Sequence, residues 1–371
     1  MRILWLYGPP AVGKSVTAWE TLNTLAARDS ATGYIDIDQL GMLHVEEADD
    51  HDDPHGHKLK GLGLAAVAAE FASVGVRTLV VSGVAGHDLT DFYAERLAPY
   101  DPAFVRLTTS YPELRRRLSA RGAYAEEWAD VEEHARTLDA ANPDHPVVES
   151  GPGGPAEVAA QVLEAVGPLV DDTPAPRGTV SLTAEDDISG GGQAVLIGGT
   201  TAVGKSTVGW QAFMATQRQG RPSAFVDLRQ LGLVGVNGGD IDHDLQARAA
   251  RALWQVFREH GAQALVMNGP VNTSAEILKY REALDGTQLS AIRLTADRTA
   301  LMDRVRARMR GEMAPLAGDS LVGRPQEEAE TIAQGALRLQ DGSDDDGDFP
   351  TLDTTELEPA ESSQRLLPGW N

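Results

Sequence analysis

Cysteine is absent from this sequence of 371 residues, which excludes disulfide bonds and thiolate chemistry and is typical of a cytoplasmic enzyme. Long apolar runs are also missing, because no stretch approaches the roughly 20 residues that cross a bilayer. Basic residues are few: 32 lysines and arginines face 55 acidic residues, and the net charge is −23. Nucleic acids and membranes bind basic surfaces, so we expect neither as a partner. A small anionic substrate needs only a local cluster of cations and stays compatible with this charge.

Lysine is the rarer of the two strong cations, and two lysines occupy equivalent places in a repeated motif. The stretches "GPPAVGKS" (8–15) and "GTTAVGKS" (199–206) both fit the P-loop pattern G-x-x-x-x-G-K-[ST]. Each follows an apolar segment and precedes a predicted helix, which is the context that the motif requires. The residues expected to hold a nucleotide are Gly8, Gly13, Lys14, Ser15 and Val16, and in the second copy Gly199, Gly204, Lys205, Ser206 and Thr207.

The chemistry of this motif is direct. Backbone N–H groups and the start of a helix surround a phosphate, and the lysine reaches the β- and γ-phosphates. The serine hydroxyl coordinates Mg²⁺, so Ser15 and Ser206 are predicted metal ligands. The expected cofactors are therefore ATP (or GTP) and Mg²⁺.

The repeat extends far beyond the motif. At an offset of 191 residues, Trp19 aligns with Trp210, Asp36 with Asp227, and "QLG" at 39–41 with "QLG" at 230–232. This indicates duplication of a whole domain. The stretch 171–192 is rich in Pro, Gly, Ser, Thr and Asp, and it reads as a linker. We therefore predict one domain over 1–170 and another over 193–371.

Each half alternates predicted strands with predicted helices. Continuous apolar runs such as "RTLVVSG" (77–83) are typical of strands that are buried on both faces of a parallel sheet. The predicted fold class is α/β, with two tandem P-loop domains that each contain a parallel sheet flanked by helices.

The predicted second strand of each half ends in aspartate. In "YIDIDQLG" (34–41), Asp36 and Asp38 are two residues apart and are expected to share one face at the carboxyl end of the sheet. Either could take the proton of an acceptor hydroxyl or hold Mg²⁺ through water, or simply cap the next helix. In "FVDLRQLG" (225–232), Asp227 is retained but Arg229 replaces the second carboxylate. Arg229 cannot be a general base, so we predict that it binds an anionic substrate or the transferred phosphate.

Arginines cluster on one predicted helix of each half, where they could clamp phosphates or form a solvated face. The candidates are spaced four residues apart and are Arg117 and Arg121 in the first half, and Arg304 and Arg308 in the second. A lid-like polar stretch, 311–325, follows only in the second half.

Two other features bear on function. The third strands end in Ser82 and Asn268 rather than in the carboxylate of a fast ATPase, which suits a small kinase. The histidine-rich stretch 44–60 is either a metal site or a substrate-binding loop to which Lys58 and Lys60 offer charge. The acidic run 340–350 is expected to be a solvated loop.

The "GPPAVGKS" loop, the "DID" strand end and the "ELRRRLSARG" helix resemble the nucleotide-kinase-like P-loop phosphotransferases, among them adenylyl-sulfate kinase, gluconate kinase, chloramphenicol phosphotransferase and zeta-type toxins. "YIDIDQLGM" is similar to a family of actinobacterial ATP-binding proteins. The resemblance implies nucleoside-kinase-like P-loop NTPase domains, an acceptor-activating Asp38, and nucleotide contacts at Arg117 and Arg121. Arg229 departs from that pattern.

Three functions are compatible with these residues. The first is an ATP-dependent small-molecule kinase with a catalytic first domain and a diverged or regulatory second domain. Its acceptor is a hydroxyl or phosphate of a metabolite, nucleotide or natural product. The second is a nucleotide sensor without catalysis, and the third is a toxin-like or nucleic-acid end kinase. The oligomeric state is not indicated by the sequence.

Overall fold

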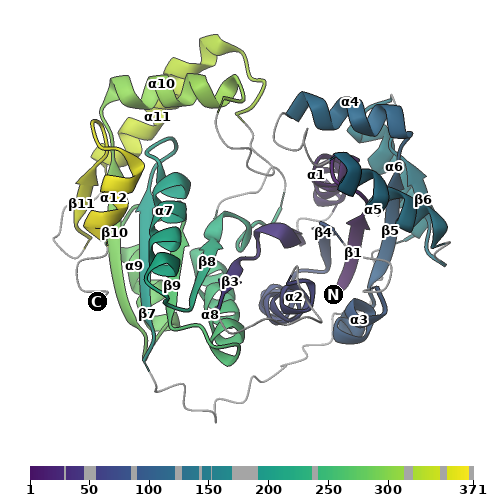
Figure 1. The fold of residues 1–371 in the computed structure, drawn as a ribbon, viewed down its shortest axis with the longest axis horizontal. Helices are drawn as coiled ribbons and strands as arrows, with labels where there is room; N and C mark the ends of the chain where they lie inside the picture. Colours follow the sequence, from purple (N-terminus) through teal and green to yellow (C-terminus); the bar gives the residue numbers. More distant parts are fainter. Residues whose placement is uncertain are drawn as a thin grey trace. The chain divides into compact units, whose positions relative to one another are not determined.

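The computed structural model describes residues 1–28, 31–45, 56–84, 90–121, 128–141, 144–151, 153–168, 191–235, 241–312, 321–342 and 349–366. It divides into two compact units (Figure 1). The first comprises Met1–Leu40, His51–Val180 and Gly232–Asp242, and the second comprises Gly41–Asp50, Ser181–Leu231 and His243–Asn371. We describe each unit separately.

The first unit is built on a five-stranded sheet in the order β2-β4-β1-β5-β6, in which every pairing is parallel. The strands are β1 (Arg2–Tyr7), β2 (Thr32–Asp36), β4 (Thr78–Ser82), β5 (Ala103–Thr108) and β6 (Val147–Glu149). The helices are α1 (Lys14–Ala26), α2 (His57–Ser73), α3 (Thr90–Arg96), α4 (Tyr111–Arg121), α5 (Trp128–Ala140) and α6 (Pro155–Val166).

Strand β1 is central in this sheet and is buried on both faces. Leu4 and Leu6 pack on one side in a cluster that includes Leu22 of α1. Trp5 points to the opposite side, where its ring centroid lies 4.5 Å from that of Tyr93 in α3. Alternate residues of a strand face opposite sides of a sheet, so a strand covered by helices on both sides is apolar along its buried part, as "ILWLY" (3–7) is.

The second unit has the same strand order plus one additional strand, β11-β10-β7-β9-β8-β3. Its strands are β7 (Gln193–Gly199), β8 (Ser223–Asp227), β9 (Ala264–Asn268), β10 (Gln288–Thr295), β11 (Thr351–Asp353) and β3 (Met42–His44). Its helices are α7 (Lys205–Arg218), α8 (His243–Glu259), α9 (Ser274–Ala283), α10 (Arg298–Met309), α11 (Ala329–Asp341) and α12 (Pro359–Leu366). The predicted fold class, two α/β P-loop domains in tandem, is confirmed. None of the helices in the described ranges has the length and apolar character needed to cross a membrane.

Each unit contains a short segment from the other half of the sequence, which the repeat did not predict. In the second unit, β3 pairs antiparallel with the edge strand β8. In the first unit, Val234 forms an antiparallel bridge to Gly33 of the edge strand β2. The N–H of Gly235 donates to the carbonyl of Thr32 at 2.9 Å there. Both segments follow "QLG", at 39–41 and at 230–232, so they come from equivalent positions of the two repeats. The predicted boundaries 1–170 and 193–371 stay a prediction.

Strand β2 ends two residues earlier than the sequence predicted. Residues Ile37–Gln39 form a 3₁₀ helix, because Asp36 Oδ1 accepts the N–H of Asp38 at 3.0 Å and caps that turn. Leu228–Gln230 forms the equivalent turn in the second unit. Asp36 and Asp38 therefore do not alternate along one strand, and the expectation that strand spacing places them on one face is wrong.

The exchanged segment of the second unit predicts a specific sensitivity at Gly41. Its φ is +124°, and a Cβ there would lie 2.8 Å from the carbonyl oxygen of Phe225. Gly41→Ala is expected to destabilise the chain by about 2–5 kcal/mol, the sum of left-handed strain and a clash with backbone. Gly75→Ala is the matched control, because φ is +87° and nothing lies within 4 Å of its Cβ. Thermal unfolding followed by circular dichroism compares the two, and equal shifts would contradict the placement of β3.

In both sheets the order of the strands places the candidate site. Strand β1 lies between β4 and β5, and β7 lies between β9 and β10. The chain therefore builds one side of each sheet first, with β2 and β4 or β8 and β9, and then crosses the central strand to β5 or β10. Ligands of parallel α/β sheets bind at such switch points, beyond the carboxyl ends of the strands. The two P-loops begin at these points, directly after β1 and β7 (Figure 1).

Candidate functional site

The first P-loop has the backbone geometry of a phosphate-binding turn. Gly8 and Gly13 have φ angles of +149° and +109°, and Ala11 is left-handed at +63°. A Cβ on Gly8 would lie 2.4 Å from the carbonyl oxygen of Leu107, so only glycine fits there. The ammonium of Lys14 donates to the carbonyls of Gly8 and Pro9, both at 2.9 Å. The predicted loop residues therefore come together, with the ammonium lying against its own loop.

Asp36 is the centre of a buried hydrogen-bond network beside that loop. The hydroxyls of Ser15 and Ser82 donate to its Oδ2 at 3.0 and 3.2 Å. The hydroxyl of Tyr34 lies 2.9 Å from the hydroxyl of Ser82 and extends this hydrogen-bond network. Burial raises the pKa of Asp36, the charge of Asp38 raises it further, and the hydrogen bond from Ser15 opposes both. Asp36 is thus placed to orient Ser15.

This pair fits a magnesium ion. Mg²⁺ is a hard cation that takes oxygen ligands. Ser15 Oγ and Asp36 Oδ2 are two oxygens held 3.0 Å apart at the start of α1 and the end of β2. Among the described residues, no group of three or more His, Cys, Asp or Glu side chains could hold a metal. The histidine alternative for 44–60 falls partly outside the described residues, since 46–55 are not among them.

Asp38 lies on the accessible side of the site. Its side chain is 44% exposed, whereas the whole Asp36 residue is only 3% exposed. Lys60 of α2 donates to Asp38 Oδ1 at 2.9 Å. The structure thus brings together a predicted base, Asp38, and a predicted substrate-binding lysine, Lys60, in the short turn that follows Asp36. Lys58 also lies in the first turn of α2.

Arg117 joins α4 to the P-loop. Its Nη1 donates to the carbonyl of Val12 at 2.8 Å and to the hydroxyl of Ser150 at 2.9 Å. Its Nε donates to Glu113, one turn earlier on the same helix. Arg121 is the last residue of α4, and its side chain lies outside the described part of the chain. Arg117 therefore contacts the loop itself, while its contact with a nucleotide stays a prediction. Ser150 is a site residue that the sequence analysis missed.

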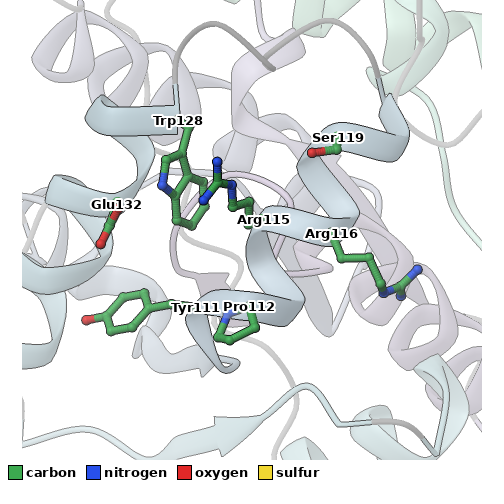
Figure 2. Close-up of a pocket in the computed structure, with 7 residues that line it drawn as sticks. All are labelled: Tyr111, Pro112, Arg115, Arg116, Ser119, Trp128 and Glu132. Carbon is green, nitrogen blue, oxygen red and sulfur yellow. The ribbon is translucent and has the colours of Figure 1, made fainter.

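A groove of about 510 Å³ opens on another face of α4, away from the residues of the P-loop. Figure 2 shows Arg115 beside the ring of Trp128, with Arg116 pointing away from it. The guanidinium carbon of Arg115 lies 5.7 Å from the ring centroid of Trp128, a cation–π distance. Consecutive arginines on α4 thus have different surroundings, and only Arg117 reaches the loop.

The second P-loop repeats the first in its backbone. Gly199, Gly204 and Ala202 have φ angles of +128°, +96° and +67°. Lys205 donates to the carbonyl of Thr200 at 2.6 Å. Burial lowers the pKa of Lys205 to about 7, with Asp227 opposing this shift and the cations Arg229 and Arg308 adding to it. The loop geometry has been retained in the second copy while its electrostatics have changed.

Arg304 holds the second loop as Arg117 holds the first. Its Nη1 and Nη2 donate to the hydroxyl and carbonyl of Thr354 at 3.0 and 2.6 Å. The hydroxyl of Thr354 in turn donates to the carbonyl of Val203 at 2.9 Å. Thr354 follows the last strand of its sheet, as Ser150 follows β6. The two arginine anchors are therefore equivalent in the two repeats.

A cavity of about 320 Å³ adjoins the second loop. It is lined by residues of the loop and α7, by Arg304, and by the segment after β11. The predicted nucleotide residues Gly204, Thr207 and Arg304 all contribute to it. Its volume lies at the lower end of the range for small-molecule sites, about 300–1,000 Å³.

Asp227, the carboxylate beside the second loop, has a different partner from Asp36 beside the first. Asp227 Oδ1 accepts the N–H of Arg229 at 3.1 Å, and the Nε of Arg229 lies 3.4 Å from the same oxygen. The hydroxyl of Ser206, the equivalent of Ser15, accepts a hydrogen bond from Nδ2 of Asn268 at 3.4 Å.

Two predicted loops lie largely outside the residues that the structure describes. Residues 313–320 of the predicted lid, 311–325, are not among them, and neither are residues 343–348 of the acidic run.

Comparison with known proteins gives fold-level similarity. No protein-family model and no curated protein matches the chain. A sugar kinase from Janibacter has 18% identity over 45% of this chain and 94% of its own, with a TM-score of 0.32. A gluconokinase from Sinorhizobium meliloti has 19% identity over 44% and 91%, with a TM-score of 0.32. The Deinococcus radiodurans tunicamycin resistance protein has 20% identity over 45% and 95%, with a TM-score of 0.33. A resemblance to gluconate kinase was also noted in the sequence analysis.

Proposed function

We propose that the protein is an ATP-dependent small-molecule kinase whose first P-loop domain carries out phosphoryl transfer and whose second domain is diverged or regulatory. The observation that carries this proposal is the arrangement beyond β1 and β2. Ser15 and Asp36 form a hydroxyl–carboxylate pair at the loop, and the accessible Asp38 is joined to Lys60. The second unit has an arginine at the position of Asp38.

In the proposed reaction, each of these groups has a separate task. The loop N–H groups and Lys14 bind the β- and γ-phosphates, and Ser15 and Asp36 would hold Mg²⁺, which neutralises phosphate charge when bound. Asp38 takes the proton of the acceptor hydroxyl as the hydroxyl oxygen attacks the γ-phosphorus. The bond between the γ-phosphorus and the β-phosphate oxygen breaks, and ADP leaves with the electron pair. Lys60 orients Asp38 through its hydrogen bond until the acceptor arrives. Arg117 positions the loop. The phosphate contact predicted for Arg121 stays a prediction.

The acceptor is proposed to be a small molecule with a hydroxyl or phosphate, such as a nucleotide, sugar or natural product. The test is transfer of label from γ-labelled ATP with Mg²⁺ to a panel of nucleosides, nucleotides, sugars and hydroxylated antibiotics. A labelled acceptor supports the kinase. Nucleotide binding without any labelled product supports a sensor, which the Arg229–Asp227 pair of the second unit favours as the second candidate.

Arg117→Ala is expected to weaken ATP binding at the first loop about tenfold, because it removes the charged hydrogen bonds that fix the loop at Val12 and Ser150. Arg116→Ala is the matched control, since Arg116 is on the same helix, is 69% exposed and pairs with Glu113. Titration calorimetry with Mg-ATP in a Lys205→Ala background compares the two. A similar loss in both variants would assign the effect to overall charge.

A further inference from the structure

The second P-loop lies in a strongly cationic environment, although the chain as a whole is acidic. Arg304 anchors the loop through Thr354, whose hydroxyl bonds to the carbonyl of Val203, and Arg229 lies beside Asp227. At the first loop, two carboxylates, Asp36 and Asp38, accompany Lys14. The two loops share an arginine anchor, Arg117 or Arg304, but differ two residues after the strand-end aspartate, where the first has the carboxylate of Asp38 and the second the guanidinium of Arg229.

The residues of the second loop do not fit Mg²⁺. At the first loop, two oxygens face each other, Ser15 Oγ and Asp36 Oδ2. At the second, the guanidinium of Arg229 is next to the corresponding carboxylate, with Nε 3.4 Å from Asp227 Oδ1. A divalent cation there would lie beside a fixed positive charge, which opposes its binding. Ser206 is held by the amide of Asn268 instead of a carboxylate, among the residues that the structure describes.

Arg229 also has an unused donor. Its Nη2 is buried and has no hydrogen-bond partner in the described structure. A buried N–H group without a partner is costly, and one on a guanidinium more so. The planar fork of arginine matches the oxygens of a phosphate, which it binds through two parallel hydrogen bonds. The orphaned Nη2 therefore points to an anionic ligand beside Lys205.

We propose that the second P-loop binds the polyphosphate of a nucleotide without Mg²⁺, and that the guanidinium of Arg229 supplies the positive charge that a metal supplies at the first loop. The adjoining cavity of about 320 Å³ has room for the rest of the nucleotide. Ser206 is then not a metal ligand. The proposal depends on nucleotide binding at this loop and not on phosphoryl transfer at either loop.

The test is calorimetric titration of the full-length chain with ATP. The Lys14→Ala background disables the first loop, and each titration is made once with excess MgCl₂ and once with excess EDTA. ATP is expected to bind at least as tightly in EDTA as in MgCl₂. Arg229→Asp, which introduces the residue of the first repeat, is expected to weaken binding in EDTA about tenfold or more and to make Mg²⁺ favourable.

Two controls make the result specific. Arg306→Ala removes an exposed arginine of α10 and should leave the affinity in EDTA unchanged. Lys205→Ala reports on the first loop, where ATP should bind tighter with Mg²⁺. The melting temperature of each variant confirms that it is folded.

Any of three results overturns the proposal. The first is ATP binding in the Lys14→Ala background that is tenfold tighter with Mg²⁺. The second is unchanged binding in EDTA after Arg229→Asp, and the third is no binding in either buffer. Failure of the kinase proposal would appear elsewhere, as absence of labelled product from the wild-type chain.

Discussion

Lys14→Ala is expected to reduce phosphoryl transfer at least about 100-fold, the usual effect of removing a group that meets charge developing in a transition state. The ammonium of Lys14 lies within the first loop, 2.9 Å from the carbonyls of Gly8 and Pro9. When phosphate enters, the ammonium can exchange these carbonyls for phosphate oxygens with little movement. The measurement is transfer from γ-labelled ATP to the acceptor that the panel identifies.

Lys205→Ala is the matched comparison at the second loop, and we expect it to change the same rate less than about tenfold. Lys279→Ala is the control for loss of a lysine, because Lys279 pairs with Asp244 at the surface of α8 and α9. Equal loss of transfer in Lys14→Ala and Lys205→Ala would contradict the division between a catalytic and a diverged domain. It would indicate instead that both loops are needed for each turnover.

Asp38→Asn is expected to lower kcat about 10²–10⁴-fold, the range that general-base catalysis contributes, while KM for ATP changes little. Asparagine has nearly the same shape and still accepts a hydrogen bond from Lys60, but it cannot take a proton. The group is accessible to an acceptor, since its side chain is 44% exposed. Initial rates at saturating acceptor and variable ATP separate the two constants.

Asp36→Asn distinguishes the two carboxylates. Asp36 is buried and accepts the hydroxyl of Ser15, so its loss should raise the Mg²⁺ concentration needed for half-maximal rate. If Asp38→Asn retains full turnover while Asp36→Asn abolishes it at every Mg²⁺ concentration, Asp36 is the base. Retention of turnover in both variants would exclude a carboxylate base at this strand end.

Several features of the site were predictable because they are local in the sequence. A P-loop is one turn between a strand and a helix, so its eight residues specify its shape. The spacing of Arg117 and Arg121 predicted a helix, and α4 covers those residues. The predicted strands of both halves appear in parallel sheets, because their continuous apolar runs can be buried only between two layers of helices.

Other features depend on contacts between distant residues. The bonds of Arg117 to Val12 and Ser150 span 105 and 33 residues, and no local pattern indicates them. The pairing of Lys60 with Asp38 likewise requires α2 to pack against the turn after β2. Thr354 became a site residue only because β11 lies beside β10 in the sheet.

The sequence by itself determined the internal similarity of its two halves, the two loops, the fold class and the replacement of a carboxylate by Arg229. Each of these follows from residue identity, spacing or periodicity. Only the tertiary structure decided that β2 stops at Asp36, that β3 pairs with β8, and that Arg229 lies against Asp227 with a buried, unpaired Nη2. A side chain's hydrogen-bond partners and exposure are set by what packs around it, and packing joins segments whose order in the chain does not predict their proximity.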